Sequence, residues 1–142
     1  MFSRKTNDLK LGMRGEKKSL PMINTHFNFN LRKLQGKYSV FDFKDVDNMI
    51  YCELKTRRCE STQYPTIMVG YNKILKGFQK IEKGYRVIIV WKFTDGLMYF
   101  ELTKKSFNYD WVNHGHLARS DRGKAELSDL AFIPCNLLIP IY

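Results

Sequence analysis

The chain has 142 residues, 44% of them hydrophobic, which is enough for one domain with one core and too apolar for a disordered protein. Lysine and arginine total 24 against 14 acidic residues, and the net charge of +10 favours a polyanionic partner, with nucleic acid expected ahead of an anionic membrane surface. The longest apolar runs have the length of a strand, so no membrane span is expected. The three cysteines match no zinc spacing and the start lacks an apolar signal segment, which favours an intracellular protein with reduced thiols.

The first half of the chain predicts a helix, a short strand and a hairpin. Residues near 6–27 place apolar side chains roughly on one side of a helix, although two glycines and Pro21 make it an imperfect helix that could kink or begin late. A short strand is expected near 29–34. Residues 38–44 and 49–56 then alternate apolar and polar side chains around a turn-forming stretch, which is typical of a β-hairpin.

The second half predicts another helix, a second hairpin and a loop-rich tail. Tyr64-Pro65-Thr66 is expected to open the helix, because proline suits a first-turn position, and Gly84 is expected to end it. Residues 86–93 and 97–102 predict strands joined by an Asp-Gly turn, and a last strand is expected near 130–133. This order of elements predicts an α/β protein with helices flanking a mixed sheet.

The first hairpin is expected to bring two acids and a lysine together. A two-residue turn centred on Asp47-Asn48 places Asp42 opposite Glu53, and Lys55 falls on the same face. Two carboxylates about 4 Å apart repel by roughly 4 kcal/mol at an effective dielectric near 20, so a proton, a cation or the lysine must neutralise them. Mg²⁺ prefers oxygen ligands of this kind, so the face predicts a metal site, and a solvated strand face with a Glu–Lys pair is the alternative.

These residues resemble the motif of the PD-(D/E)xK nuclease superfamily, which is an acid on one strand followed by acid-x-Lys on its antiparallel neighbour. Asp42 matches the first acid and Glu53-Leu54-Lys55 matches the rest. The pattern around them, and the tail Arg119-Ser120-Asp121-Arg122-Gly123-Lys124, look like small nuclease-like proteins of large DNA viruses. The resemblance covers roughly residues 10–140. It implies a restriction endonuclease-like αβββαβ core, one domain over residues 1–142, and a location in the cytoplasm or nucleus, including that of a virus-infected cell.

The resemblance further implies a metal-dependent phosphodiester hydrolase, most specifically a DNA endonuclease. Asp42 and Glu53 would bind Mg²⁺ or Mn²⁺, with Glu16 from the first helix and the backbone carbonyl of Leu54 as further ligands. Lys55 would orient or activate the attacking water and offset the negative charge that grows on phosphorus. Resolvases of this fold are usually dimers, so a homodimer is compatible with the resemblance.

Basic residues outside the motif are candidates for contacts with the phosphate backbone. They are Arg57 and Arg58 after the second strand of the hairpin, Lys73 and Lys76 on the second helix, and Arg119, Arg122 and Lys124 in the tail. A solvated face is the commoner explanation for a lysine stripe on a helix. Lys73 is the exception, because the resembling proteins often carry Lys or Gln near the active site on this helix. A solvated loop is an equal alternative for the tail.

Several alternatives stay open. Asp45 and Asp47 are rival acids, although this register puts the first on the apolar face and the second in the turn. His114 and His116 form a His-x-His pair, but no further ligand clusters nearby, which favours a surface loop over a zinc site. The main alternative function is a catalytically silent nucleic-acid-binding module on the same fold, and a structural protein with a basic surface is the third. The intact acid–acid–lysine set argues against the silent module.

Overall fold

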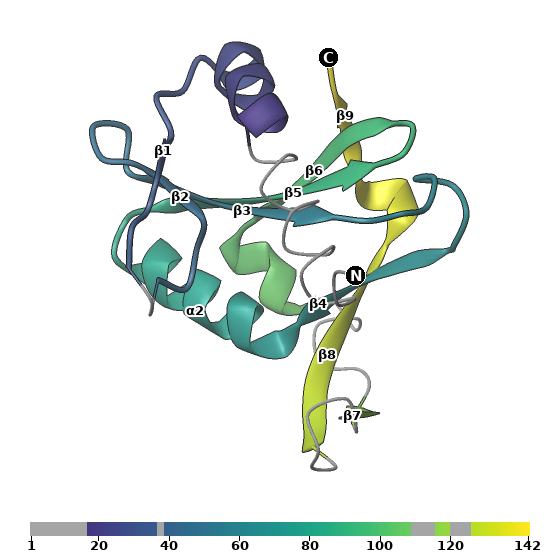
Figure 1. Ribbon diagram of the computed structural model, residues 1–142. Coiled ribbons are helices and arrows are strands. Elements are labelled where there is room, and N and C mark those ends of the chain that lie inside the picture. The colour runs from purple at the N-terminus through teal and green to yellow at the C-terminus, as the bar shows by residue number, and fades with distance from the viewer. Residues whose placement is uncertain (1–16, 37–38, 109–115, 120–125) are drawn as a thin grey trace, which may run out of the picture.

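The computed structural model describes residues 17–36, 39–108, 116–119 and 126–142. Its central feature is a six-stranded sheet made of Arg32–Lys33 (β1), Phe43–Asp45 (β2), Ile50–Thr56 (β3), Arg86–Phe93 (β5), Gly96–Leu102 (β6) and Ile139–Ile141 (β9) (Figure 1). The strands lie in the order β1-β2-β3-β5-β6-β9. The pair β3–β5 is parallel and the other neighbouring pairs are antiparallel, which confirms the predicted α/β class and mixed sheet.

Helices cover both faces of this sheet (Figure 1). One helix includes residues 17–27, and α2 spans Tyr71–Glu82 on the opposite face. Gly84 has a φ of 95° and its N–H donates to the carbonyl of Ile81, so α2 ends where the sequence predicted. The N-terminal helix is confirmed from residue 17 onward, and the expected residues before it lie outside the described part of the chain. No helix in the described ranges is long and apolar enough to cross a membrane.

The segment predicted to open the second helix is a strand, so that prediction is wrong. Thr66–Gly70 forms β4, and α2 begins only at Tyr71. Ile67 and Val69 are buried while Met68 between them is exposed, and this alternation, with β-branched residues, suits a strand. Proline at position 65 therefore precedes a strand and does not occupy a first helical turn.

β4 belongs to a second, three-stranded sheet that the sequence did not predict. It pairs antiparallel with β8, Glu126–Pro134, which pairs in turn with β7, His116–Arg119. The expected strand near 130–133 is thus part of a longer one. A short 3-10 helix, η1 at Lys104–Asn108, follows β6, and another at Cys135–Leu137 leads from β8 into β9.

The hairpin of β2 and β3 has the predicted register. Phe43 pairs with Cys52, and Asp45 pairs with Ile50. The turn is longer than expected, because residues 46–49 all lie outside the ladder and Met49 has a φ of 55°. The buried Asp45 carboxylate closes this turn by accepting hydrogen bonds from the backbone and side-chain amides of Asn48. Asp45 therefore has a structural role here, as its place on the apolar face suggested.

Two apolar clusters lie on either side of the six-stranded sheet. The cluster on the α2 side is built mainly on Tyr51, Ile67, Val69, Ile74, Phe78, Val87, Ile89 and Trp91. The cluster on the side of the N-terminal helix includes Ile23, Ile50, Cys52, Leu54, Ile88 and Val90. Phe41 and Phe43 fall into different clusters, although the alternation predicted for residues 38–44 would place both on one face of a strand. The reason is a bend at residues 41–42, just before β2, which interrupts the strand alternation.

Candidate active site

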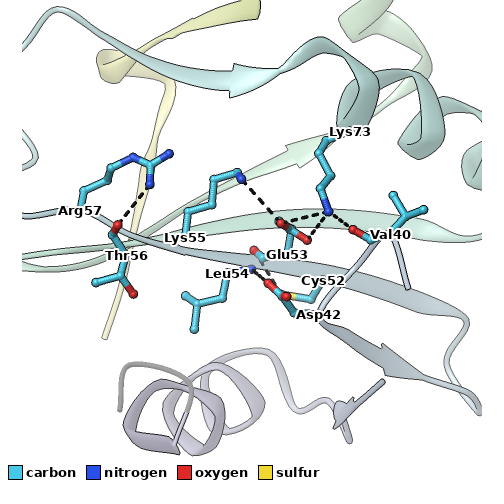
Figure 2. A network of polar contacts seen from close by, with 9 residues as sticks. All are labelled: Val40, Asp42, Cys52, Glu53, Leu54, Lys55, Thr56, Arg57 and Lys73. Carbon is cyan, nitrogen blue, oxygen red and sulfur yellow. Dashed lines mark hydrogen bonds and ion pairs between the residues drawn. The ribbon is translucent and has the colours of Figure 1, made fainter. Parts of the chain in front are cut away.

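The candidate site is built on the second half of β3, where one strand points side chains to both faces. Glu53 and Lys55 point toward α2, and Leu54 between them packs into the opposite cluster (Figure 2). Glu53 is only 5% exposed, which is unusual for a carboxylate. A buried acid of this kind needs hydrogen bonds or counter-charges, and the surrounding elements supply them.

Asp42 reaches the same level of β3 from the other strand of the hairpin. Its Oδ2 accepts a hydrogen bond of 2.8 Å from the backbone N–H of Leu54 (Figure 2). Its backbone carbonyl accepts a hydrogen bond from the N–H of Leu34. Among the described residues, the β2–β3 ladder ends at the Phe43–Cys52 pair. The Asp42 carboxylate therefore takes the place that a ladder partner would occupy, next to Glu53, as the predicted register requires.

Two lysines share the carboxylate of Glu53. Lys55 Nζ lies 3.6 Å from Glu53 Oε1, and Lys73 Nζ lies 3.3 Å from Oε1 and 3.3 Å from Oε2. Lys73 extends from α2 across the sheet and also donates to the backbone carbonyl of Val40 (Figure 2). These contacts bring Lys73 into the site, as its exceptional position on the helix suggested, while Lys76 on the same helix is exposed.

Burial and charge act against each other at these groups. Burial, and after it the charge of Asp42, raise the pKa of Glu53 above its ordinary value, although Lys55 and Lys73 oppose the change. Burial lowers the pKa of Lys55, and the nearby charges of Arg57 and Lys73 add to this effect while Glu53 counters it. The site thus holds an acid whose charged form is poorly stabilised by the protein alone, which favours the uptake of a cation.

The donor set is suitable for a hard divalent cation. Asp42 and Glu53 are two carboxylates fixed beside each other, and oxygen ligands are what Mg²⁺ and Mn²⁺ prefer. Residues of a strand direct their N–H and carbonyl groups to the same side, so the Leu54 carbonyl leaves β3 on the side where Asp42 binds the Leu54 N–H. Within the described ranges, no third Asp, Glu, His or Cys completes a cluster, so further ligands would be backbone oxygens, water or phosphate.

The structure describes only some of the other predicted site residues. Arg57 is partly buried at the end of β3, where its Nη1 donates to the Thr56 carbonyl at 3.1 Å and burial lowers its pKa. Arg58 is exposed beside it. For Arg119 only the strand β7 is described. The remaining three candidates, Glu16, Arg122 and Lys124, lie outside the described residues.

Comparison with known protein families assigns the chain to a family. A family model described as "Phage putative PDDEXK endonuclease" matches residues 10–140. The chain belongs to this family. No curated protein matches the chain. The family assignment agrees with the predicted PD-(D/E)xK superfamily, with the restriction endonuclease-like fold and with a phage or viral origin. Asp42, Glu53 and Lys55, which the sequence analysis compared with the superfamily motif, lie close together beside β3.

Proposed function

We propose that this phage PDDEXK family member is a metal-dependent endonuclease that cleaves DNA at the site formed by Asp42, Glu53 and Lys55. The observation that carries the proposal is that a fixed Asp42 carboxylate lies beside the buried carboxylate of Glu53. Lys55 and Lys73 are the counter-charges of Glu53. A purely structural acid would be expected to find its hydrogen bonds within the fold, as Asp45 does with Asn30 and Asn48.

Asp42 and Glu53 would hold Mg²⁺ or Mn²⁺, with the Leu54 carbonyl and Glu16 as further ligands. When bound, the cation polarises the scissile phosphate and lowers the pKa of water. The chain's own groups do the rest. Asp42 is kept in place by the Leu54 N–H, and the Lys55 ammonium, on the same face as Glu53, orients the attacking water and offsets negative charge on the phosphate.

Lys73 is proposed as the second cation of the site. Its ammonium group bridges both Glu53 oxygens and is partly exposed, so it can turn from the carboxylate to a phosphate oxygen once a metal takes over the neutralisation of Glu53. Arg57, Arg58, Lys76 and, from the tail, Arg119, Arg122 and Lys124 are proposed contacts for the nucleic-acid backbone beyond the scissile phosphate.

The decisive experiment is a cleavage assay on labelled duplex, single-stranded and four-way-junction DNA, with RNA as a further substrate. Each substrate is incubated with Mg²⁺, Mn²⁺ or a chelator, and Lys55→Ala is assayed beside the wild type. Metal-dependent cleavage that is lost in Lys55→Ala supports the proposal and names the substrate. Tight binding without cleavage under every condition would overturn it in favour of a silent binding module. Light scattering on the same samples tests the homodimer.

A further inference from the structure

A second group of charged and aromatic side chains lies near the candidate active site and takes no part in it. It consists of Lys44 on β2, Tyr51 on β3, Lys80 on α2 and Tyr85 before β5, and is called here the Tyr51 cluster. Lys44 Nζ lies 5.0 Å from the ring centroid of Tyr51 and 5.2 Å from that of Tyr85. Lys80 Nζ lies 4.9 Å from the Tyr51 centroid, and the two tyrosine rings are 4.8 Å apart.

The Tyr51 cluster concentrates positive charge. Lys44 and Lys80 both approach the ring of Tyr51, so two ammonium groups lie around one aromatic side chain. Within the part of the chain that the structure describes, neither lysine forms an ion pair with a carboxylate. Contact with an aromatic face is worth about 0.5–1 kcal/mol at an exposed site and leaves the positive charge of each ammonium group without a counter-charge. An anion bound by both lysines would neutralise that charge.

The hydroxyl group of Tyr51 lies in the field of both lysines. Lys44 Nζ lies 5.0 Å and Lys80 Nζ lies 4.9 Å from the centroid of the Tyr51 ring. The cluster thus combines two ammonium groups with a phenol that can donate a hydrogen bond. This set of groups suits a phosphate oxygen.

The position of the cluster relates it to the active site. Tyr51 precedes Glu53 by two residues, so both side chains lie on the α2 face of β3, roughly 6.6 Å apart along the strand. Successive phosphates on one nucleic-acid strand are spaced by about 3.4 Å along the helix axis, so this offset corresponds to a near neighbour of the scissile phosphate. Lys73 and Lys80 are separated by seven residues, or two turns of α2, which places one lysine over Glu53 and the other over Tyr51.

The ring of Phe41 fills the space between the two sites. Lys73 Nζ lies 5.9 Å from the Phe41 centroid, and the Phe41 and Tyr51 centroids are 5.3 Å apart. Since Phe41 is buried, it joins the active site to the Tyr51 cluster by a packed, apolar contact. The two sites are therefore held next to each other on the α2 face of the sheet.

We propose that the Tyr51 cluster is a second phosphate-binding site, which holds the nucleic-acid backbone next to the phosphodiester bound at Asp42 and Glu53. Lys44 and Lys80 neutralise the phosphate charge, and the Tyr51 hydroxyl donates a hydrogen bond to one of its oxygens. The identity of the polymer rests on the proposed function, whereas the anion-binding chemistry of the cluster does not depend on cleavage.

The test is the salt dependence of DNA binding, measured by fluorescence anisotropy with a labelled duplex in chelator, so that no cleavage occurs. The double variant Lys44→Gln/Lys80→Gln keeps two polar side chains of similar length, and Lys104→Gln/Lys105→Gln, at two exposed positions of η1, removes the same charge. We expect the first variant to bind more weakly and to reduce the salt slope by about 0.9 for each phosphate that the protein no longer neutralises. The control is expected to stay within about twofold of the wild type at physiological salt, since scattered surface charges contribute weakly under screening.

Tyr51→Phe tests the contribution of the Tyr51 hydroxyl group apart from that of the two lysine charges. It should weaken binding while leaving the salt slope unchanged, because the hydroxyl releases no counterion. Equal binding of Lys44→Gln/Lys80→Gln and its control, with unchanged melting temperatures, would overturn the second phosphate site even if the enzyme cleaves DNA. Conversely, a specific loss of binding in that variant, together with no cleavage by the wild type under any metal condition, would uphold the site and overturn the nuclease proposal alone.

Discussion

The Asp42 carboxylate accepts the backbone N–H of Leu54 at 2.8 Å, at a level of β3 that β2 does not reach. A side chain thereby supplies the hydrogen bond that a longer strand would supply through its backbone. This hydrogen bond fixes an acid beside Glu53 at the point where the ladder ends. Asp42 therefore has two roles that can be tested separately. Its carboxylate oxygen binds the backbone of β3, and its negative charge acts on Glu53.

Asp42→Asn is expected to keep the fold while abolishing metal-dependent cleavage. The amide oxygen of asparagine can still accept the Leu54 N–H, and the loss of charge removes the repulsion from Glu53. The free energy of unfolding of the metal-free protein should therefore rise by about 1 kcal/mol in urea denaturation. Asp42→Ala is the matched comparison, because it leaves the Leu54 N–H without its acceptor and should lower stability by about 1–2 kcal/mol. Equal destabilisation by both variants would mean that the charge itself is structural.

Because of Glu53, the free energy of unfolding of the metal-free protein is expected to fall as the pH rises. Burial and the charge of Asp42 raise its pKa, so the folded protein keeps this proton to a higher pH than the unfolded chain does. The stabilising contribution is fully present below the ordinary pKa of glutamate and is lost as the pH rises through the raised value. Glu53→Gln should flatten this dependence in urea denaturation with chelator between about pH 4 and 8. Glu60→Gln, at an exposed position, controls for the loss of one carboxylate, and an unchanged slope in Glu53→Gln would contradict the raised pKa.

The acidic pair could be predicted from the sequence because its geometry is local. Turn composition and strict alternation fix the register of a hairpin, and a slip of one residue would have moved Glu53 to the other face of β3. The same reasoning failed for the residues directly before β2. The bend at residues 41–42 places Phe41 on the α2 side of the sheet, whereas Phe43 packs on the side of the N-terminal helix. Alternation describes a strand only as far as its ladder extends.

The rest of the site depends on contacts that are distant in sequence. β4 is a five-residue strand whose partner, β8, lies far along the chain, so its local pattern could not distinguish it from the first turns of a helix. The approach of Lys73 to Glu53 depends on the packing of α2 against the sheet, and the Tyr51 cluster joins β2, β3, α2 and the residue before β5. The roles of Glu16, Arg122 and Lys124 stay predictions, because these residues lie outside the described ranges.

Lys73→Met is expected to tighten the binding of Mn²⁺ or Mg²⁺ and to lower the stability of the metal-free protein. The Lys73 ammonium lies 3.3 Å from both oxygens of Glu53, so it competes with a metal for the same acceptors. Methionine keeps an unbranched stem without the charge. Removal of this like charge is worth about 1 kcal/mol after solvent screening, or roughly a fivefold decrease in the Kd measured by calorimetry. Lys76→Met on the same helix is the control, and weaker metal binding in Lys73→Met would show that Lys73 supports the ligands instead of competing with the metal.

Gly77→Ala is expected to destabilise the protein and to reduce cleavage, although alanine favours helices by about 1 kcal/mol over glycine. Gly77 is buried in α2, and a methyl group there would lie 2.6 Å from Leu102 Cδ2 and 3.4 Å from Val87 Cγ1. Leu102 is 2% exposed and has little room to move, so the helix must shift away from the sheet at a cost of about 1–3 kcal/mol. Because α2 carries Lys73, that shift should also disturb the contact with Glu53. The double variant Gly77→Ala/Leu102→Val should recover part of the lost stability in thermal unfolding and part of the cleavage rate, and a destabilisation that is simply additive would place its cause outside this contact.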